Sequence, residues 1–309
     1  SGCGKSTLLR SIAGLTPLDD GEIAVGGTVV DDGRRAVPPE RRPVGLVFQE
    51  HALFPHLTIG ANVGFGIRGS ARAERATQVD DLLEMVGIAH LRDRYPHEVS
   101  GGERQRASVA RAVAPRPALL LLDEPFASLD PNLRTAVRRA LVGLLRDTGT
   151  PAVFVSHDQA EALALGDRLA VMRGGRLEQV GSGPDVYDRP ANRFVAGFMG
   201  EASFLPVEPA DGSWRTELGP VEAAADGPAP TAGLLAVIRP ADVDLEPAAD
   251  GPAEVVEATY EGPTWHYLVR LPSGATVGAT EARSLRLAVG DRVAVRPLTT
   301  TPALVADAD

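Results

Sequence analysis

The sequence predicts two domains of different class, an α/β domain with a largely parallel sheet followed by a small all-β domain. Residues 118–122 are a continuous apolar run without alternation, which is typical of a central parallel strand covered on both faces. Strand-like and helix-like segments alternate to about residue 200, and this order favours a parallel sheet. From residue 234 onward, short β-rich segments separated by turns indicate a barrel-like domain.

The composition is that of a globular protein and narrows the functional classes. The 309 residues are 44% hydrophobic and 23% charged, which suits one large domain or two ordinary ones. A net charge of −10 with no basic block argues against nucleic acid as the main partner. The single cysteine, Cys3, excludes a disulfide framework and a cysteine metal cluster, so a reducing compartment is expected. No apolar run approaches the ~18 residues of a membrane-spanning helix.

The first seven residues match the second half of the phosphate-loop pattern G-x-x-x-x-G-K-[ST]. They are Ser1, Gly2, Cys3, Gly4, Lys5, Ser6 and Thr7. The backbone N–H groups of such a loop cradle phosphates, its lysine reaches the outermost ones and its hydroxyl meets Mg²⁺. A helical pattern that stops at Gly14 follows, as a loop of this kind requires. The first glycine of the pattern would lie upstream of Ser1, so we expect the natural chain to begin further upstream.

Polar side chains follow three of the apolar, strand-like segments. They are Gln49, Asp123, Glu124 and His157. Ligand-facing groups of open α/β sheets lie at the carboxyl ends of strands, so these four residues are candidates for a site. Taken one at a time, each also fits an ordinary polar strand end, and a lone histidine there is more often structural.

Glycine pairs and helix-start signals predict further local structure. Gly26-Gly27 and Gly174-Gly175 each join two β-rich runs, which predicts two hairpins. Residues 79–86 carry the apolar stripe of an amphipathic helix, within what looks like a helical insertion between residues 54 and 94. Two further helix starts are marked by Ser100, Gly101, Gly102 and Glu103, which contain the capping box S-x-x-E, and by Asp130, an N-cap candidate before a proline.

In this order, the phosphate loop, Gln49, the segment 100–105, the Asp123-Glu124 pair and His157 resemble the ATP-binding cassette of an ABC transporter. The resemblance covers residues 1–200 and implies a P-loop NTPase (RecA-like) core, with its helical subdomain at about residues 54–112. Residues 201–309 resemble the β-rich, barrel-like (OB/TOBE-type) domain of importer ATPases for iron, polyamine, sulfate and maltose. Within that group, the segments 39–42, 49–56 and 201–206 look most like ferric-iron importer subunits.

The resemblance implies ATP and Mg²⁺ as cofactors and a role for each candidate residue. Lys5 and the amides around Gly4 would hold the β- and γ-phosphates. The Mg²⁺ ligands, direct or through water, would be Ser6, Gln49 and Asp123. Glu124 would be the general base, with His157 as the switch residue at the γ-phosphate and Gln49 beside the attacking water.

The family resemblance also implies that the site is completed by a second molecule. In this family, Ser100, Gly101 and Gly102 face the nucleotide of a partner cassette, so a homodimer or another paired cassette is expected. Glu103 stands where the commonest family form has glutamine; it serves the capping box equally well but adds a negative charge that bears on the rate of hydrolysis. Asp130 would lie at the dimer interface, a role compatible with that of an N-cap.

The function implied is an ATP-hydrolysing subunit that powers import, with ferric iron as the leading substrate. Alternatives are import of polyamine, thiamine, quaternary amines or sulfate. The expected partners are two membrane-spanning permease subunits and, indirectly, an extracytoplasmic substrate-binding protein, with no nucleic acid. The expected location is peripheral, on the cytoplasmic face of the inner membrane. A non-transport ABC protein and a regulatory module whose tail binds a ligand are alternatives of another class.

Overall fold

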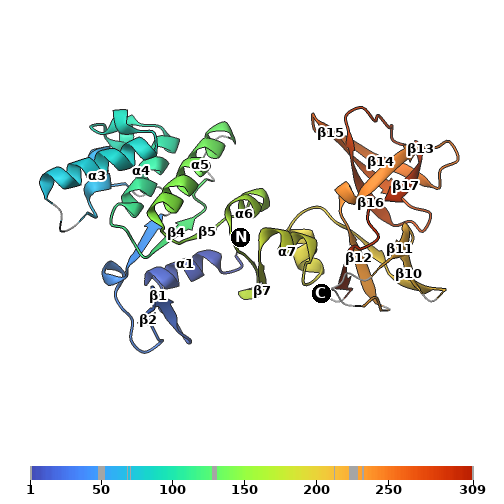
Figure 1. Cartoon of the computed structure of the whole chain (residues 1–309), viewed down its shortest axis with the longest axis horizontal. Helices are drawn as coiled ribbons and strands as arrows, with labels where there is room; N and C mark the ends of the chain where they lie inside the picture. Colours follow the sequence, from blue (N-terminus) through green and yellow to red (C-terminus); the bar gives the residue numbers. More distant parts are fainter. Residues whose placement is uncertain are drawn as a thin grey trace. The chain divides into compact units, whose positions relative to one another are not determined.

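A computed structural model of the chain describes residues 2–47, 53–67, 69, 71–126, 131–211, 213–222, 229–231 and 233–307, without the side chains of 131–133. The chain divides into two compact units, residues 1–165 and 166–309 (Figure 1). The domain limits expected from the family resemblance, 1–200 and 201–309, stay a prediction. Each unit is described separately below.

The sheet of the first unit consists of three parallel strands in the order β3-β4-β5. They are β3 (Val44–Val47), β4 (Leu119–Asp123) and β5 (Ala152–Val155). In the register, Leu46 lies opposite Leu121, and Asp123 lies opposite Val155. The apolar run at 118–122 is therefore the central parallel strand that the sequence predicts.

Helices cover both faces of β4. Its residues Leu120 and Leu122 join one hydrophobic cluster with residues of α4 (Gly101–Val113) and α5 (Pro131–Thr148), while Leu121 joins Leu9 of α1 (Lys5–Ala13) in another. Leu120, Leu121 and Leu122 have no exposed surface. Figure 1 accordingly shows α1 on one side of the strands and α4 with α5 on the other. Such burial on two faces explains the run without alternation.

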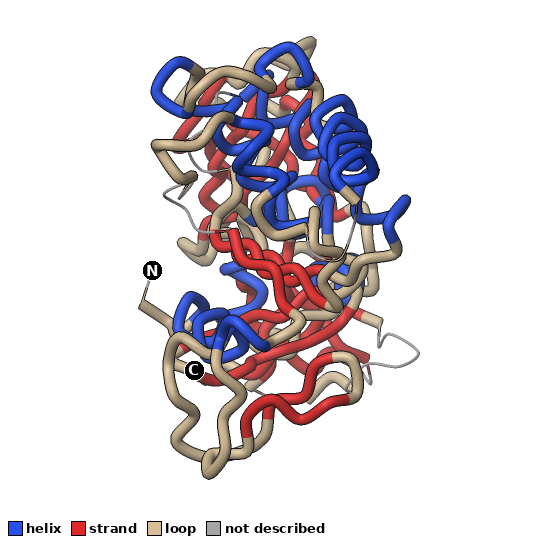
Figure 2. The backbone as a smooth tube through the Cα atoms, turned by 90° about the vertical axis from the view of Figure 1, so that its left-hand side faces the viewer, coloured by secondary structure: helices blue, strands red, loops and turns tan. Residues whose placement is uncertain are grey.

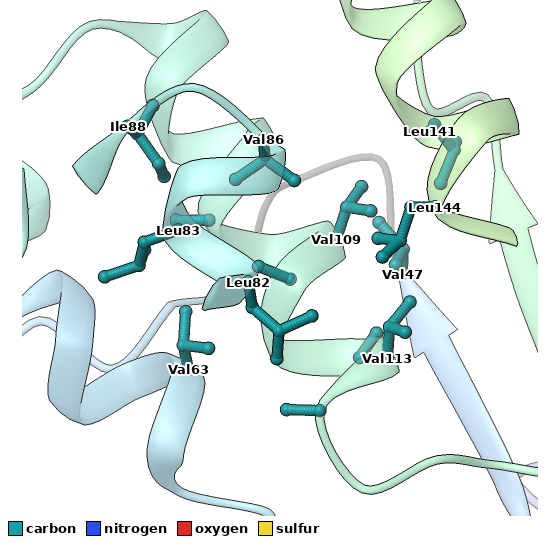
Figure 3. Packing of buried hydrophobic residues seen from close by; sticks show 14 of the residues in the cluster. Val47, Val63, Leu82, Leu83, Val86, Ile88, Val109, Val113, Leu141 and Leu144 are labelled. Atoms are coloured by element: carbon teal, nitrogen blue, oxygen red, sulfur yellow. The ribbon is translucent and has the colours of Figure 1, made fainter. Parts of the chain in front are cut away.

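The helical part of the first unit contains α2 (Ile59–Gly64), α3 (Arg72–Met85) and α4. The predicted stripe of α3 is buried in one cluster with Val109 of α4. Figure 3 shows Leu82, Leu83 and Val86 of this stripe within the cluster. After α3 the chain turns through Gly87, whose φ of 68° is left-handed and favours glycine. Three-residue 3₁₀ turns lie at Pro39–Arg41, Ala89–Leu91 and Pro96–Glu98.

Two small elements complete the first unit. Strands β1 (Ile23–Val25) and β2 (Thr28–Asp31) form an antiparallel hairpin, as predicted from Gly26-Gly27. Helix α6 (Gln159–Leu165) follows β5.

The second unit begins with a hairpin and two short helices. Strands β6 (Leu169–Arg173) and β7 (Arg176–Gly181) pair antiparallel, which confirms the hairpin predicted at the second glycine pair. Helices α7 (Gly183–Asp188) and α8 (Arg193–Phe198) follow. The buried guanidinium of Arg239 donates to the carbonyl oxygens of Tyr187 and Ala196, so these helices are tied to the strands that come later.

Most of the remaining regular structure in the second unit is strand (Figures 1 and 2). A five-stranded antiparallel sheet has the order β13-β17-β14-β15-β16, and two three-stranded sheets have the orders β18-β12-β8 and β11-β10-β9. The strands are β8 (Ser203–Pro206), β9 (Glu208–Ala210), β10 (Ser213–Thr216), β11 (Gly219–Val221), β12 (Leu234–Ile238), β13 (Val243–Pro247), β14 (Ala253–Tyr260), β15 (Thr264–Arg270), β16 (Thr276–Ala282), β17 (Arg292–Pro297) and β18 (Ala303–Ala306). A 3₁₀ turn at Pro240–Asp242 precedes β13.

The two outer strands of the five-stranded sheet, β13 and β16, are joined through a side chain. The backbone N–H of Leu245 in β13 donates to Oε1 of Glu281 in β16 over 2.8 Å. One hydrophobic cluster contains Val255, Val269 and Val293 of this sheet together with Leu205 of β8 and Ala236 of β12. The predicted C-terminal β-rich domain is thus present, and its strands form these three sheets.

Candidate active site

The phosphate loop leads directly into α1. Gly4 is the N-cap, with a left-handed φ of 93°, and Gly2 has a φ of 101°, angles that glycine adopts without the steric cost of a side chain. The first bond of the helix runs from Leu8 N–H to the Gly4 carbonyl, so the amides of the first turn have no partner within the helix. Unpaired amides and the helix dipole together favour an anion at this end.

Ser6 and Asp123 meet at the carboxyl end of the central strand β4. The Ser6 hydroxyl donates to Oδ1 of Asp123 over 3.2 Å, although the two residues are 117 positions apart. They meet because Leu9 of α1 and Leu121 of β4 belong to one core cluster, which fixes the helix against the strand. A hydroxyl and a carboxylate are the hard oxygen ligands that suit Mg²⁺, so the residues present fit the predicted ion.

Lys5 lies over its own loop. Its ammonium Nζ is 3.4 Å from the Cys3 sulfur. Burial acts to raise the pKa of the Cys3 thiol, but the hydrogen bond and charge of Lys5 outweigh it, and the pKa is lowered. The lysine ammonium therefore lies beside another residue of the phosphate loop.

Glu124 and His157 lie in direct contact. Their Oε1 and Nδ1 atoms are 3.2 Å apart, with 25% of the glutamate side chain and 65% of the imidazole exposed. Glu124 has a left-handed φ of 48°, which costs a residue other than glycine about 1–3 kcal/mol. Its N–H donates to the carbonyl of Val155, the last residue of β5, and this bond helps to hold the strained turn. A solvent-accessible carboxylate next to an imidazole is suited to accept a proton from water.

A small polar pocket opens beside this pair. It is lined by Glu124, Arg134, Ser156, His157, Asp158 and Glu161. Sequence reasoning did not single out Arg134 or Glu161; the only local signal was the D-x-x-E spacing from Asp158 to Glu161, a capping pattern.

The helix start at Ser100 is a complete capping box. The Ser100 N–H donates to Oε2 of Glu103 over 2.8 Å, and the Glu103 N–H donates to the Ser100 hydroxyl over 3.4 Å. The backbone N–H of Ser100 is the main reason that the pKa of Glu103 lies below its usual range. The predicted cap is confirmed, and the carboxylate of Glu103 accepts its hydrogen bond from Ser100 of the same chain.

The structure gathers some of the predicted site residues and leaves others apart. Ser6 lies with Asp123, and Glu124 lies with His157, at the ends of the adjacent strands β4 and β5. Within the described residues, no hydrogen bond or ion pair joins the Ser100–Glu103 cap to either pair. The candidates Ser1, Gln49 and Asp130 lie outside the described residues. Among the described helices, none is long and apolar enough to cross a membrane.

Fold and site together define a P-loop ATPase, and comparison with known proteins identifies its family. Residues 1–127 match the ABC transporter family, and residues 236–299 match the TOBE domain. The chain belongs to the ATP-binding subunits of ABC transporters that carry a TOBE domain, and its enzymatic class is that of the ABC transporter ATPases.

Three similar proteins carry names with different substrates. The chain is 43% identical to the spermidine/putrescine import ATP-binding protein PotA 1 of Pseudomonas aeruginosa, over 94% of this chain and 82% of that protein. It is 43% identical to the sulfate/thiosulfate import ATP-binding protein CysA of Bradyrhizobium diazoefficiens, over 96% and 87%. It is 41% identical to the Fe(3+) ions import ATP-binding protein FbpC of Mesorhizobium japonicum, over 91% and 81%.

A solved structure shares the fold of part of the chain. The ATP-binding cassette MJ0796, a dimer in a post-hydrolysis state bound to ADP and Pi, is 30% identical, with a TM-score of 0.51. The match covers 59% of this chain and 81% of that one.

Proposed function

We propose that this chain is the ATPase subunit of an importer and that ferric iron is the substrate imported. The observation that carries the ATPase role is the meeting of two pairs, Ser6 with Asp123 and Glu124 with His157, at the carboxyl ends of two adjacent strands. The names of the three relatives support import. The segments 39–42, 49–56 and 201–206, which resemble ferric-iron importer subunits, favour iron.

The residues divide the work of hydrolysis. Lys5 and the amides after Gly4 bind the β- and γ-phosphates, while Ser6, Asp123 and Gln49 hold Mg²⁺. When bound, this ion neutralises charge on the phosphates. Glu124 orients a water molecule and accepts its proton as the water oxygen attacks the γ-phosphorus and the bond from that phosphorus to the bridging oxygen of ADP breaks. His157 contacts the γ-phosphate and keeps Glu124 in place.

A second cassette completes the site. Ser100, Gly101 and Gly102 present amides at the start of α4, a 13-residue helix, and these would bind the γ-phosphate held by the partner. Glu103 already accepts two hydrogen bonds from Ser100, so part of its charge is compensated within its own chain. Asp130 would lie at the interface between the two cassettes.

The membrane partners would dock on the segment from Phe54 to Phe65. The buried amide of Asn62 donates to the carbonyls of Phe54, Leu57 and Thr58, so this segment is held firmly on α2. Phe65 is 64% exposed, and the centroid of its ring lies 4.5 Å from the centroid of the Phe54 ring. A rigid, partly apolar surface of this kind suits docking to a permease loop at the cytoplasmic face of the membrane.

The substitution Glu124→Gln in the full chain tests the mechanism. It keeps the size of the side chain but removes the base, so phosphate release should fall by at least about 100-fold, while ATP still brings two cassettes together. Phosphate release measured with a coupled assay and dimer content measured by size exclusion with ATP give the two readouts. Undiminished turnover in this variant would show that Glu124 is not the base.

Purification with the transport partners tests the substrate. A ferric-iron importer should copurify with an extracytoplasmic protein that binds Fe³⁺ tightly. If the copurified protein binds spermidine or sulfate and not iron, the iron assignment is wrong while the ATPase role stands.

A further inference from the structure

The turn that carries His157 is closed by hydrogen bonds on both sides of the histidine. The N–H of Asp158 donates to the Ser156 hydroxyl over 3.0 Å, which spans His157. The same hydroxyl donates to Oε2 of Glu161 over 2.8 Å, and the N–H of Glu161 donates to Oδ1 of Asp158 over 3.1 Å. Because the imidazole itself is largely exposed, packing does not hold it, and its position depends on this backbone turn.

Arg134 links this turn to a different element. It lies on α5, and its Nη1 is 3.5 Å from Oδ2 of Asp158, while its Nε is 3.8 Å from Oε1 of Glu161. The Glu161 side chain is only 8% exposed, and a buried carboxylate is costly without a compensating charge. Arg134 supplies that charge.

The helix that carries Arg134 is a rigid support. Val137, Leu141 and Leu144 of α5 are buried in the main core of the first unit, which also contains Leu120 and Leu122 of β4. Figure 3 shows Leu141 and Leu144 in this core. Glu124 follows β4 directly. Arg134 therefore connects the His157 turn to the core that also positions the strand before Glu124. A side chain that is supported by rigid elements keeps its geometry better than one on an isolated loop, so this connection should help to fix His157.

We propose that Arg134 is a positioning residue, which holds the His157 turn through Asp158 and Glu161 and thereby sets the contact between His157 and Glu124. This inference rests on the proposed roles of Glu124 and His157. In this role Arg134 acts through the carboxylates of Asp158 and Glu161. Its loss lets the turn move, so the step of bond breaking slows while the phosphate loop still binds ATP.

The test compares kcat and KM for MgATP in variants of the full chain. Arg134→Met should lower kcat by about tenfold, equivalent to about 1.4 kcal/mol, with KM within about twofold of the wild-type value. Arg134→Lys, whose ammonium can still reach a carboxylate, should recover part of the loss. Asp158→Asn removes the charge but keeps an N-cap acceptor, and should also lower kcat. Because Arg134 and Asp158 act through the same ion pair, the double variant Arg134→Met with Asp158→Asn should lose little more kcat than the worse of the two single variants.

Arg139→Met is the matched control, because Arg139 is an exposed arginine of the same helix. It should leave kcat unchanged. A purely structural role for Arg134 would lower the melting temperature and the fraction of active protein equally in the Met and Lys variants. If Arg134→Met does not fold, Arg134→Lys and Asp158→Asn decide the matter with the same readouts.

Three results would overturn the inference: a wild-type kcat in Arg134→Met, a loss confined to KM, or an equal loss in Arg139→Met. His157→Ala, measured in parallel, separates this inference from the mechanism on which it rests. Full turnover in His157→Ala would mean that the proposed role of His157 is wrong. Loss of turnover there together with normal turnover in Arg134→Met would mean that only the positioning role is wrong.

Discussion

Ser6 and Asp123 show how a site is built from single residues that the chain keeps far apart. Their hydrogen bond of 3.2 Å joins the first turn of α1 to the end of β4. Glu124, one residue further, turns away from the strand through its left-handed φ of 48° and reaches His157. Consecutive carboxylates can therefore take different partners, Asp123 the Ser6 hydroxyl and Glu124 the imidazole of His157.

The substitution Ser6→Ala should weaken the response to Mg²⁺. Removing the hydroxyl takes away one oxygen ligand, so the Mg²⁺ concentration for half-maximal hydrolysis should rise by at least about tenfold. Ser6→Thr keeps the hydroxyl and should retain most activity. Ser11→Ala serves as control, because Ser11 is a buried serine on the same helix. An unchanged Mg²⁺ titration in Ser6→Ala would exclude the proposed ligand role.

At the scale of elements, α1 has a different role at each end. Its N-terminus carries the phosphate loop, and at its C-terminus Arg42 donates to the carbonyls of Ser11 and Ile12. The same guanidinium is paired with Asp31 at the end of β2 over 2.9 Å, with side-chain exposures of only 1% and 3%. A cation at the last carbonyls also complements the helix dipole.

Replacing Arg42 with methionine should destabilise the first unit by about 3–5 kcal/mol, because Asp31 would be left buried without its partner. Chemical denaturation followed by circular dichroism measures the loss. Arg41→Met is a suitable comparison, since Arg41 is exposed and should change stability by less than about 0.5 kcal/mol. A loss below about 1 kcal/mol for Arg42→Met would mean that water or a rearranged chain compensates Asp31.

Elements with a strong local pattern could be predicted, and those that depend on distant partners could not. Patterns of neighbouring residues were enough to predict four features: the strand before Asp123, the buried stripe of α3, the helix cap at Ser100 and the hairpins at the glycine pairs. Strand β13 has only a weak local signal, because Asp244 and Glu246, residue types that are depleted in strands, stand beside Val243 and Leu245 in a stretch of five residues. The charges of Arg42 and Arg134 look like those of any surface arginine, since only the fold brings them to their carboxylates.

At the scale of the whole molecule, each of the two units has its own core and its own means of closure. In the second unit, Glu281 accepts the N–H of Leu245 and so joins the outer strands β13 and β16. Burial is the main reason that the pKa of Glu281 is raised. A raised pKa means that the folded state favours the neutral acid, so the stability contributed by this group is complete below the unfolded pKa and is lost as pH rises through the folded pKa.

Glu281→Gln should therefore make the second unit more stable at pH 7.5 than the wild type, and should leave its stability at about pH 4 almost unchanged. The glutamine oxygen still accepts the N–H of Leu245 but carries no charge to bury. Thermal unfolding at the two pH values tests this expectation. A wild-type advantage at pH 7.5 would show that the ionised carboxylate strengthens the closure.

The packing of Leu121 against Leu9 has a consequence for thermodynamic linkage. The contact that stabilises the fold is also the contact that brings Ser6 to Asp123, so the nucleotide site is preassembled by the core and folding carries the entropic cost of ordering it. A ligand that binds only the folded state then adds its binding free energy to stability, about 2.7 kcal/mol at 100 times its Kd. A substitution at Leu121 that loosens this packing should lower apparent nucleotide affinity together with stability, because only molecules with an assembled site bind the nucleotide.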